Sequence, residues 1–301
     1  MDQARNLSAW LNRLAWLAVA VWSAHYLLGI GGLFLVHPDW LFGDARLYYQ
    51  ATATWVAGGD PWAVSRGGIA FAGIPPTLLL NLPFLPFGED AAWIFWPVAG
   101  MVGMAVALRR LRLPLWWLAW PPFMEGWFPG SPDMALFALA ILGGGAVVAV
   151  TKPYSVPWML GDGRWRALTI GAIIAVVTIP ILPWGMFIAD LPAIATTLSD
   201  QARHLSAWGT PILMVPTVAA LLWLRRPGLS LVTPGLWPSS QLHYAAFSLE
   251  TAARTPILAL GLAIPIPGVA PLSIVAYALW VRFRDVRSRR LEGVPGSLKL
   301  T

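Results

Sequence analysis

The stretch "FGDARLYYQATATWVAGGDPW" (residues 42–62) places two carboxylates, an arginine and two tyrosines directly after the first long apolar segment. Apolar or aromatic side chains recur in it at helical spacing, at Leu47, Tyr48, Ala51 and Trp55. Residues 45–57 are therefore expected to form an amphipathic helix that Gly58 and Gly59 end. Such a helix would lie in a membrane interface rather than cross the membrane. Asp44 then has two compatible interpretations, as the N-cap of this helix or as a functional carboxylate.

The composition is typical of an integral membrane protein. The chain has 301 residues, of which 57% are hydrophobic and 11% charged, which is too apolar for a soluble domain. Its 19 tryptophans suit a protein with two water–lipid interfaces. The absence of cysteine excludes disulfides and thiolate chemistry. The net charge of +6 comes from arginines in short runs between apolar segments, which indicates topology signals and lipid-phosphate contacts rather than nucleic-acid binding.

Apolar segments that approach the length of a membrane span follow one another along the chain. The regular ones are residues 14–36, 91–108, 131–150, 167–189 and 209–224. Proline or glycine interrupts the others, at 74–88, 114–129, 228–250 and 255–283. Interrupted backbone at membrane depth is tolerated where protein or water covers it, so these segments are expected to line a cavity. The predicted fold class is all-α, a polytopic transmembrane helical protein of about eight to ten membrane segments, some of them re-entrant.

Arginine clusters indicate the orientation. They lie at Arg5 and Arg13, at Arg109, Arg110 and Arg112, at Arg164 and Arg166, at Arg225 and Arg226, and in "RFRDVRSRR" (282–290). The positive-inside rule makes them cytoplasmic and puts residues 37–73 and 190–208 on the outer side. No repeat or linker divides the chain, so residues 1–284 are expected to form one transmembrane domain, followed by a short basic cytoplasmic tail at 285–301. A prokaryotic plasma membrane is the expected location.

Several segments resemble, in order, the motifs of GT-C membrane glycosyltransferases. They are Asp44 after the first apolar segment, "GGDPW" (58–62), "IPP" (74–76), "FPGSPDMALFALAILGG" (128–144), "TKPYSVPWMLGDGRWRAL" (151–168) and "WPSSQLHYAAFSL" (237–249). Over about residues 10–250 this order is most similar to glycosyltransferase family 87, the polyprenyl-phosphate-mannose-dependent alpha-mannosyltransferases. The chain departs from the family pattern at Ile74, Asp133 and Gln241-Leu242, and it is short for the family.

The resemblance implies a GT-C-like enzyme that transfers a hexose, with mannose expected, from a polyprenyl-phosphate donor to a lipid or glycan acceptor outside the membrane. It places Asp44 in the first outer loop, where GT-C enzymes carry the essential carboxylate, and it implies inversion at the anomeric carbon. The chemistry needs a carboxylate for the hydroxyl proton, cations or donors that steady the departing phosphate, and a groove for the prenyl chain. No cofactor is expected.

Candidates for holding the donor phosphate or the substrate are Lys152, His243, Arg66, Arg46, Tyr48, Asp60 and Asp133. At a cytoplasmic boundary Lys152 would only snorkel, unless its segment re-enters the membrane. Asp60 precedes a proline and is more simply a turn residue. His243 follows a Pro-Ser-Ser turn and can be protonated near neutral pH. Glu125 and Asp133 flank a broken segment, where they either complete an acidic pocket or cap a helix.

No metal site is predicted, because the four histidines are far apart and no Asp-x-Asp pair occurs. Two other functions remain open. A shortened, non-catalytic relative could bind lipid-linked glycans or scaffold an envelope complex, which the departures at Ile74 and Gln241-Leu242 favour. A small transporter would suit broken helices, but the polar residues cluster in the first outer loop rather than at mid-membrane. The expected partners are a polyprenyl-phosphate-linked sugar, a glycolipid or glycan acceptor and membrane lipid, with no nucleic acid.

Overall fold

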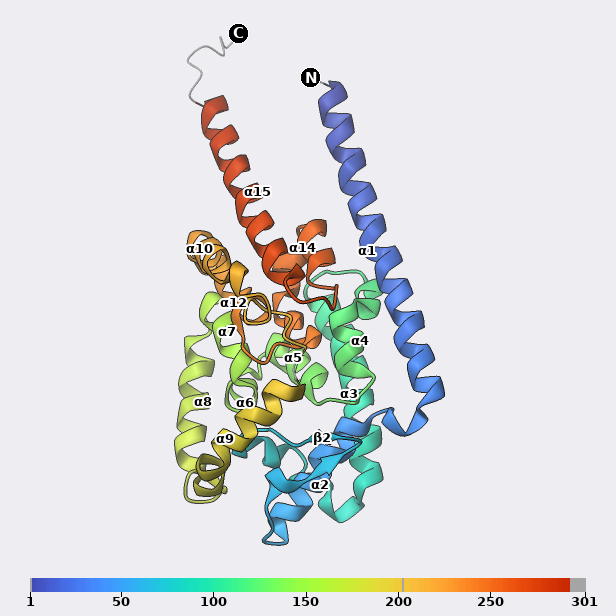
Figure 1. Ribbon diagram of the computed structural model, residues 1–301, viewed down its shortest axis with the longest axis vertical. Helices are drawn as coiled ribbons and strands as arrows, with labels where there is room; N and C mark the ends of the chain where they lie inside the picture. The colour runs from blue at the N-terminus through green and yellow to red at the C-terminus, as the bar shows by residue number, and fades with distance from the viewer. Residues whose placement is uncertain (1, 202, 293–301) are drawn as a thin grey trace.

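The protein is mostly helical, as a computed structural model that describes residues 2–201 and 203–292 shows. Helices α1 (Asp2–Val36) and α15 (Val269–Glu292) extend from the same end of the molecule, and α2 (Gly43–Val56) lies at the opposite end (Figure 1). Within the described ranges, the strands are β1 (Ser65–Arg66) and β2 (Ile69–Ala70), an antiparallel hairpin near α2. The predicted all-α class agrees with this architecture.

The other elements are short helices, many of which begin with proline. The α-helices are α3 (Glu89–Arg110), α4 (Pro121–Trp127), α5 (Asp133–Leu142), α6 (Gly145–Thr151), α7 (Val156–Gly161), α8 (Trp165–Thr178), α9 (Trp184–Gln201), α10 (Met214–Leu224), α11 (Arg226–Leu229), α12 (Val232–Leu236), α13 (Leu249–Ala252) and α14 (Pro256–Gly261). The 3-10 helices are η1 (Pro38–Trp40), η2 (Pro61–Ala63), η3 (Pro75–Leu80), η4 (Leu82–Phe87), η5 (Leu115–Ala119), η6 (Pro153–Ser155), η7 (Pro211–Leu213) and η8 (Leu242–Ser248). Proline suits a first helical position because its fixed φ matches the helix and no N–H is needed there.

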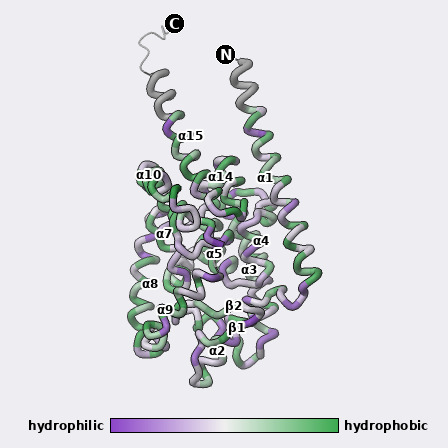
Figure 2. The backbone as a smooth tube through the Cα atoms, viewed as in Figure 1, coloured by the Kyte–Doolittle hydropathy of each residue, from purple (hydrophilic) through white to green (hydrophobic). Residues whose placement is uncertain are grey.

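By length and composition, two of the described helices could cross a membrane. They are Ala9–Val36 within α1 and Glu89–Arg110, which is α3, and they contain the predicted segments 14–36 and 91–108. Asp133–Leu142, Trp165–Thr178 and Pro211–Leu224 are apolar but shorter. Hydrophobic residues nevertheless follow α1, α8 and α10 along the outside of the molecule (Figure 2). Among the described residues, helices long enough to be candidate spans are therefore fewer than the predicted number of membrane segments.

The segment 131–150 is not one continuous helix, contrary to the sequence-based expectation. Helix α5 ends at Gly143, whose φ is +115°, and α6 then packs back against α5. A left-handed φ costs other residues about 1–2 kcal/mol but costs glycine little, so the glycine run provides the turn. Asp133 begins this helical hairpin and Lys152 follows its end, so the two side chains meet.

Two other segments also differ from the prediction. Residues 167–189 are divided between α8 and α9, because Pro180 and Pro183 interrupt the helix between them. The basic region 285–292, predicted to belong to the tail, continues α15 as helix. The rest of the predicted tail, residues 293–301, lies outside the described residues.

The main core is aromatic and fixes the broken helices in place. Its fully buried side chains include Trp117, Trp120, Phe123 and Phe137. Neighbouring rings in this row meet edge-on or tilted, with centroids 5.3–5.7 Å apart, which is a favourable arrangement for aromatic pairs. The row runs from η5 through α4 to α5. It therefore holds the start of α5, which carries Asp133, against the middle of the molecule.

Helix α2 is packed on protein. Its predicted apolar face is buried, with Leu47 and Ala51 in a small cluster that also includes Phe71. The helix also packs against α3 and η3. Gly58, at φ +83°, follows its C-terminus as predicted. This packing holds the first turns of α2, and with them Asp44, in a fixed position.

Candidate active site

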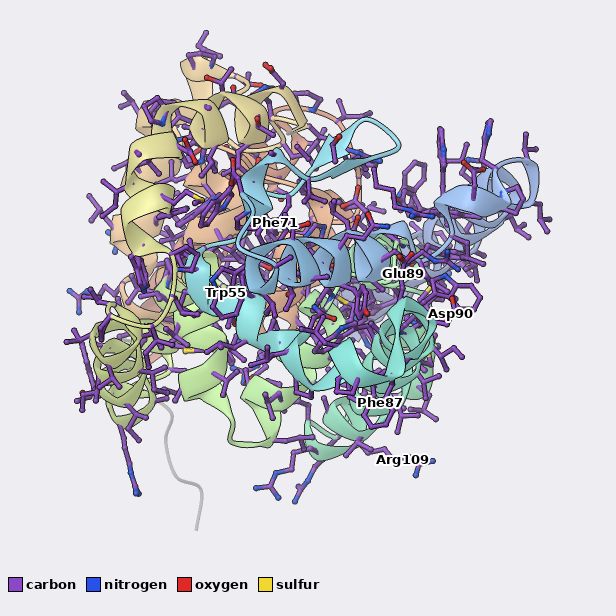
Figure 3. All side chains as sticks on the ribbon, turned by 90° about the horizontal axis from the view of Figure 1, so that it is seen from below. Trp55, Phe71, Phe87, Glu89, Asp90 and Arg109 are labelled. Carbon is purple, nitrogen blue, oxygen red and sulfur yellow. The ribbon has the colours of Figure 1, made fainter. Side chains whose placement is uncertain are left out.

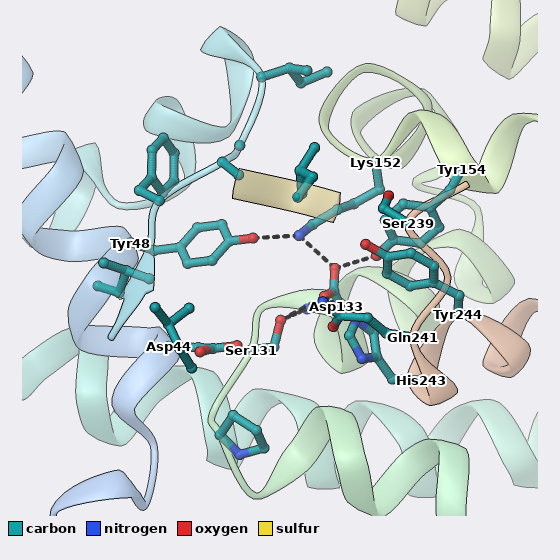
Figure 4. A pocket seen from close by; sticks show the side chains of 18 of the residues that line it. Asp44, Tyr48, Ser131, Asp133, Lys152, Tyr154, Ser239, Gln241, His243 and Tyr244 are labelled. Atoms are coloured by element: carbon teal, nitrogen blue, oxygen red, sulfur yellow. Dashed lines mark hydrogen bonds and ion pairs between the residues drawn. The ribbon is translucent and has the colours of Figure 1, made fainter. Parts of the chain in front are cut away.

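A cavity of about 410 Å³, hereafter the polar cavity because ionisable side chains line its centre, lies between α2, α4, the α5–α6 hairpin and η8. The ionisable side chains that line it are Asp44, Tyr48, Glu125, Asp133, Lys152, Tyr154, Arg203, His243 and Tyr244. In Figure 4, Tyr48 and Lys152 point toward each other from opposite walls, above Asp133 and His243. The structure thus brings together six of the residues singled out from the sequence, namely Asp44, Tyr48, Glu125, Asp133, Lys152 and His243.

Lys152 and Asp133 form a buried ion pair at the centre of the cavity. Lys152 Nζ lies 2.6 Å from Asp133 Oδ1 and 2.7 Å from the hydroxyl of Tyr48. The Asp133 carboxylate also accepts hydrogen bonds of 2.6 Å from the hydroxyls of Tyr154 and Ser131. Burial lowers the pKa of Lys152, but the adjoining Asp133 carboxylate outweighs burial and raises it above its ordinary value. Lys152 is therefore a fixed cation of the cavity rather than a snorkelling surface residue.

His243 links this pair to a second carboxylate. Its Nε2 lies 3.2 Å from Asp133 Oδ2, its Nδ1 lies 3.6 Å from Glu125 Oε2, and its backbone N–H donates to Glu125. Glu125 in turn forms an ion pair of 3.0 Å with Arg203. Burial lowers the pKa of His243, but hydrogen bonds with Asp133 and Glu125 outweigh it and raise the pKa to about 9. Cations and carboxylates consequently alternate from Arg203 to Lys152.

Asp44 stands apart from this charged chain. It is the second residue of α2, its side chain caps no helix, and the residue before the helix is Phe42. The N-cap interpretation of Asp44 is therefore wrong. Within the described part of the chain, its carboxylate has no hydrogen-bond or ion-pair partner. Burial raises the pKa of Asp44 to about 6, while the nearby charge of His243 limits the rise.

A second cavity, of about 760 Å³, adjoins the polar one and is largely apolar. Helix α1 forms one wall of it, through Trp22, Tyr26, Ile30, Leu33 and Phe34. The residues that line both cavities are Asp44, Leu47, Ile69, Glu125, Pro129 and Arg203. Asp44 thus lies where a charged cavity meets an apolar one.

Three predicted site residues lie elsewhere. Arg46 forms ion pairs with Glu89 at 3.4 Å and Asp90 at 3.5 Å, at the start of α3 on the face shown in Figure 3. Arg66 forms an ion pair of 3.5 Å with the same glutamate and lines the apolar cavity. Asp60 accepts a hydrogen bond from the backbone N–H two residues on and caps η2, which is the turn role that the sequence favoured.

Several lining residues were missed from the sequence. Tyr154 and Tyr244 stack with ring centroids 4.0 Å apart, and Trp237 meets Tyr154 edge-on at 6.3 Å. Tyr154 lies two residues after Lys152, so a search around that lysine could have found it. No nearby sequence motif points to Arg203, because it follows a helix of ordinary amphipathic composition. These residues add aromatic faces and a further cation to the cavity.

Comparison of the chain with protein-family models, with curated proteins and with solved structures found no match. The resemblance to GT-C enzymes therefore rests on the sequence motifs alone. Over residues 2–201 and 203–292, no group of three or more His, Cys, Asp or Glu is placed to hold a metal ion. In the cavity, Glu125 and Asp133 instead bind cationic side chains.

Proposed function

We propose that the protein is a multi-pass membrane glycosyltransferase that transfers a hexose from a polyprenyl-phosphate donor to a lipid or glycan acceptor. The observation that carries the proposal is the position of Asp44 at the junction of a polar and an apolar cavity, where its carboxylate has no ion-pair partner among the described residues. A polyprenyl-phosphate sugar has the same two parts, a charged head and a long apolar chain. Its head would occupy the polar cavity while its chain lies along α1.

Membrane placement is supported by the apolar side chains that face outward. On α1, Leu28 is 77% and Leu35 is 85% exposed. Large apolar side chains are also exposed on other helices, including Val102 on α3, Ile173 and Val177 on α8, Val215 and Leu222 on α10, and Phe283 on α15. Soluble monomers rarely expose contiguous apolar surface on this scale. Lipid is the solvent in which such faces are stable.

Aromatic faces and hydroxyl groups together support a sugar as the polar ligand. The stacked rings of Tyr154 and Tyr244 and the indole of Trp237 line one side of the polar cavity. Sugar rings combine apolar C–H faces with hydroxyls, and pockets that bind small molecules likewise combine apolar walls with a few fixed polar groups. The Tyr48 hydroxyl and the charged groups provide those polar contacts.

In the proposed reaction, the acceptor hydroxyl oxygen attacks the anomeric carbon of the donor and forms a new bond to it. The bond between that carbon and the phosphate oxygen breaks, and its electron pair leaves with the polyprenyl phosphate. Asp44 takes the proton of the hydroxyl, for which a pKa of about 6 is well suited near neutral pH. Lys152, His243 and Arg203 are the cationic groups of the cavity that would bind the departing phosphate.

The test is transfer of radiolabelled mannose from polyprenyl-phosphate-mannose by purified protein in liposomes, with a mixed membrane-glycolipid extract as acceptor. Asp44→Asn is expected to lower transfer by at least about 100-fold and to keep donor binding, since a positioned general base contributes roughly 10²–10⁴-fold. Asp60→Asn is the matched control in the same loop, because asparagine caps a helix as well as aspartate does.

The outcomes separate the possible functions. Transfer that survives Asp44→Asn would contradict the role of Asp44. If the unsubstituted protein binds the donor but transfers nothing to any acceptor, the chain is better described as a non-catalytic binder of lipid-linked glycan. The internal pairing of Lys152 with Asp133 is the feature that would favour this second function.

A further inference from the structure

A small cavity lies between α15 and the segment that connects α13 to α14. Helices α14 and α15 lie toward the end of the molecule opposite α2, the helix that carries Asp44 (Figure 1). We propose that this cavity binds the phosphate headgroup of an anionic phospholipid. The cavity has a volume of about 250 Å³ and is lined by Arg254, Thr255, Tyr277, Trp280, Val281 and Arg284. Pockets for whole small molecules are larger, roughly 300–1,000 Å³, so the size suits a headgroup. The inference rests on the membrane placement proposed above, but not on sugar transfer.

Two packed elements build this cavity. Tyr277, Trp280, Val281 and Arg284 recur at intervals of three and four residues, so they share one face of α15. The opposite wall is Arg254 and Thr255, which connect α13 to α14. Helix α14 packs directly against α15, so the two walls are held together. The arrangement is therefore fixed by the fold rather than by a mobile surface loop.

The lining selects an anion. Among the side chains that the structure describes, it includes two guanidinium groups and two hydroxyls, and no carboxylate. Arg254 forms no ion pair with a carboxylate of the described residues, although Glu250 lines a neighbouring cavity that Arg254 also borders. The Arg284 guanidinium lies 4.9 Å above the Trp280 ring, which orients it. Guanidinium groups bind phosphate through paired charge-assisted hydrogen bonds, which makes phosphate the favoured ligand.

The surroundings favour a lipid as the source of that phosphate. On α15, Leu279 is 51% and Phe283 is 78% exposed, beside the cavity-lining Trp280. The Arg282 guanidinium lies 5.3 Å above the ring of Trp223 from α10. A second arginine of α15 therefore pairs with a tryptophan. Tryptophan and arginine at the edge of an apolar face are typical of the headgroup level of a bilayer. Acyl chains would then lie against Leu279 and Phe283.

The test is native mass spectrometry of the full chain purified in detergent. Dioleoyl-phosphatidylglycerol, dioleoyl-phosphatidylcholine and inorganic phosphate are added separately at matched concentrations. We expect one phosphatidylglycerol to bind preferentially, and Arg254→Gln to weaken that binding about fivefold, the effect of roughly one surface arginine on anionic lipid. Arg254→Lys keeps the charge but not the paired hydrogen bonds, so it should recover part of the affinity.

Arg110→Gln is the matched control, because Arg110 is also an exposed arginine at the end of a long apolar helix but lines neither this cavity nor its neighbour. Equal loss of phosphatidylglycerol in Arg110→Gln and Arg254→Gln would overturn the site. Equal binding of phosphatidylcholine would overturn the selection for an anion. Binding of inorganic phosphate as tight as that of phosphatidylglycerol would overturn the lipid as ligand. Failure of membrane placement is detected separately, as protein that stays in solution without detergent.

Discussion

Asp44 is a residue whose proposed role conflicts with the stability of the fold. Burial raises the pKa of its carboxyl to about 6 from an unfolded value near 4, so the folded state favours the protonated form. Its stabilising contribution is complete below the unfolded pKa and is lost as the pH rises through about 6. At pH 8 the ionised Asp44 is therefore a destabilising group, as functional carboxylates in partly dry sites often are.

Replacing Asp44 with asparagine should reveal the destabilising effect of its ionised carboxylate. Asp44→Asn is expected to keep or increase the free energy of unfolding at pH 8, by up to about 2 kcal/mol once partial exposure of the site is taken into account. At pH 4 the difference should nearly vanish, because the native carboxyl is then protonated. Denaturant unfolding in detergent at both pH values measures it. A variant that is markedly less stable at pH 8 would show that the carboxylate is held by stabilising partners.

The pH dependence of transfer follows from two groups. Activity should rise with pH through about 6 as Asp44 ionises, and it should fall through about 9 as His243 loses its proton. The resulting bell shape is measured as kcat/KM for the donor between pH 4.5 and 10.5, which is roughly the range over which both groups titrate. In His243→Gln, the residual activity should lack the alkaline limb. An alkaline limb that persists in this variant would assign it to another group.

Replacing one member of the Lys152–Asp133 pair should lower the free energy of unfolding far more than replacing both members. Asp133→Asn leaves Lys152 buried without a charge partner, which typically costs about 3–5 kcal/mol of stability. Adding Lys152→Met removes the orphaned charge and should recover much of the loss. The measurement is a double-mutant cycle by chemical denaturation. Simple additivity of the two single effects would mean that the pair is not coupled.

At the residue scale, the sequence predicted most of the charged residues of the candidate site but not all of the residues that line its cavity. Asp44, Tyr48, Asp133, Lys152 and His243 were found because each lies in a motif or interrupts an apolar run. Tyr154 and Arg203 belong to segments whose composition is ordinary, and only tertiary packing brings them to the cavity. Arg46 likewise lies outside the cavity, where it pairs with Glu89 at the start of the next helix.

At the element scale, the decisive feature is the turn between α5 and α6. Gly143 occupies φ +115°, and an added Cβ would meet no atom within 4 Å, so any effect of substitution comes from the backbone. Gly143→Ala should lower stability by about 1–2 kcal/mol and weaken transfer, because the hairpin positions Asp133 and Lys152. Gly185→Ala is the control, since Gly185 also has open space but lies in an ordinary helical turn. Equal effects of the two substitutions would contradict this account.

Long, uninterrupted apolar helices were predictable, whereas broken ones were not. The positions of α1 and α3 follow from segment length, and that of α2 follows from its periodicity and the glycines after it. The α5–α6 hairpin was predicted as one span because its glycines are themselves compatible with an apolar run. Prolines 180 and 183 give a clearer signal, but hydropathy averaged over 167–189 conceals the break.

At the scale of the whole molecule, the orientation can be tested with single cysteines, because the chain has none of its own. Ser65→Cys lies in the exposed β1–β2 hairpin, and Arg110→Cys lies at the end of α3. An impermeant maleimide should label the first in intact cells and the second only after permeabilisation. The reverse pattern would place the polar cavity on the cytoplasmic side and remove the basis for an outward-facing reaction.

With the proposed membrane placement, the α5–α6 hairpin also bears on how its two charged side chains enter a bilayer during synthesis. Its two ends close a loop of only roughly 20 residues, so Asp133 and Lys152 can meet before any later segment has emerged from the ribosome. Neutralised as a pair, they avoid the penalty of presenting two isolated charges to the translocon. The hairpin would then insert into the membrane as a preassembled, nearly uncharged unit, and the later helices would pack onto it.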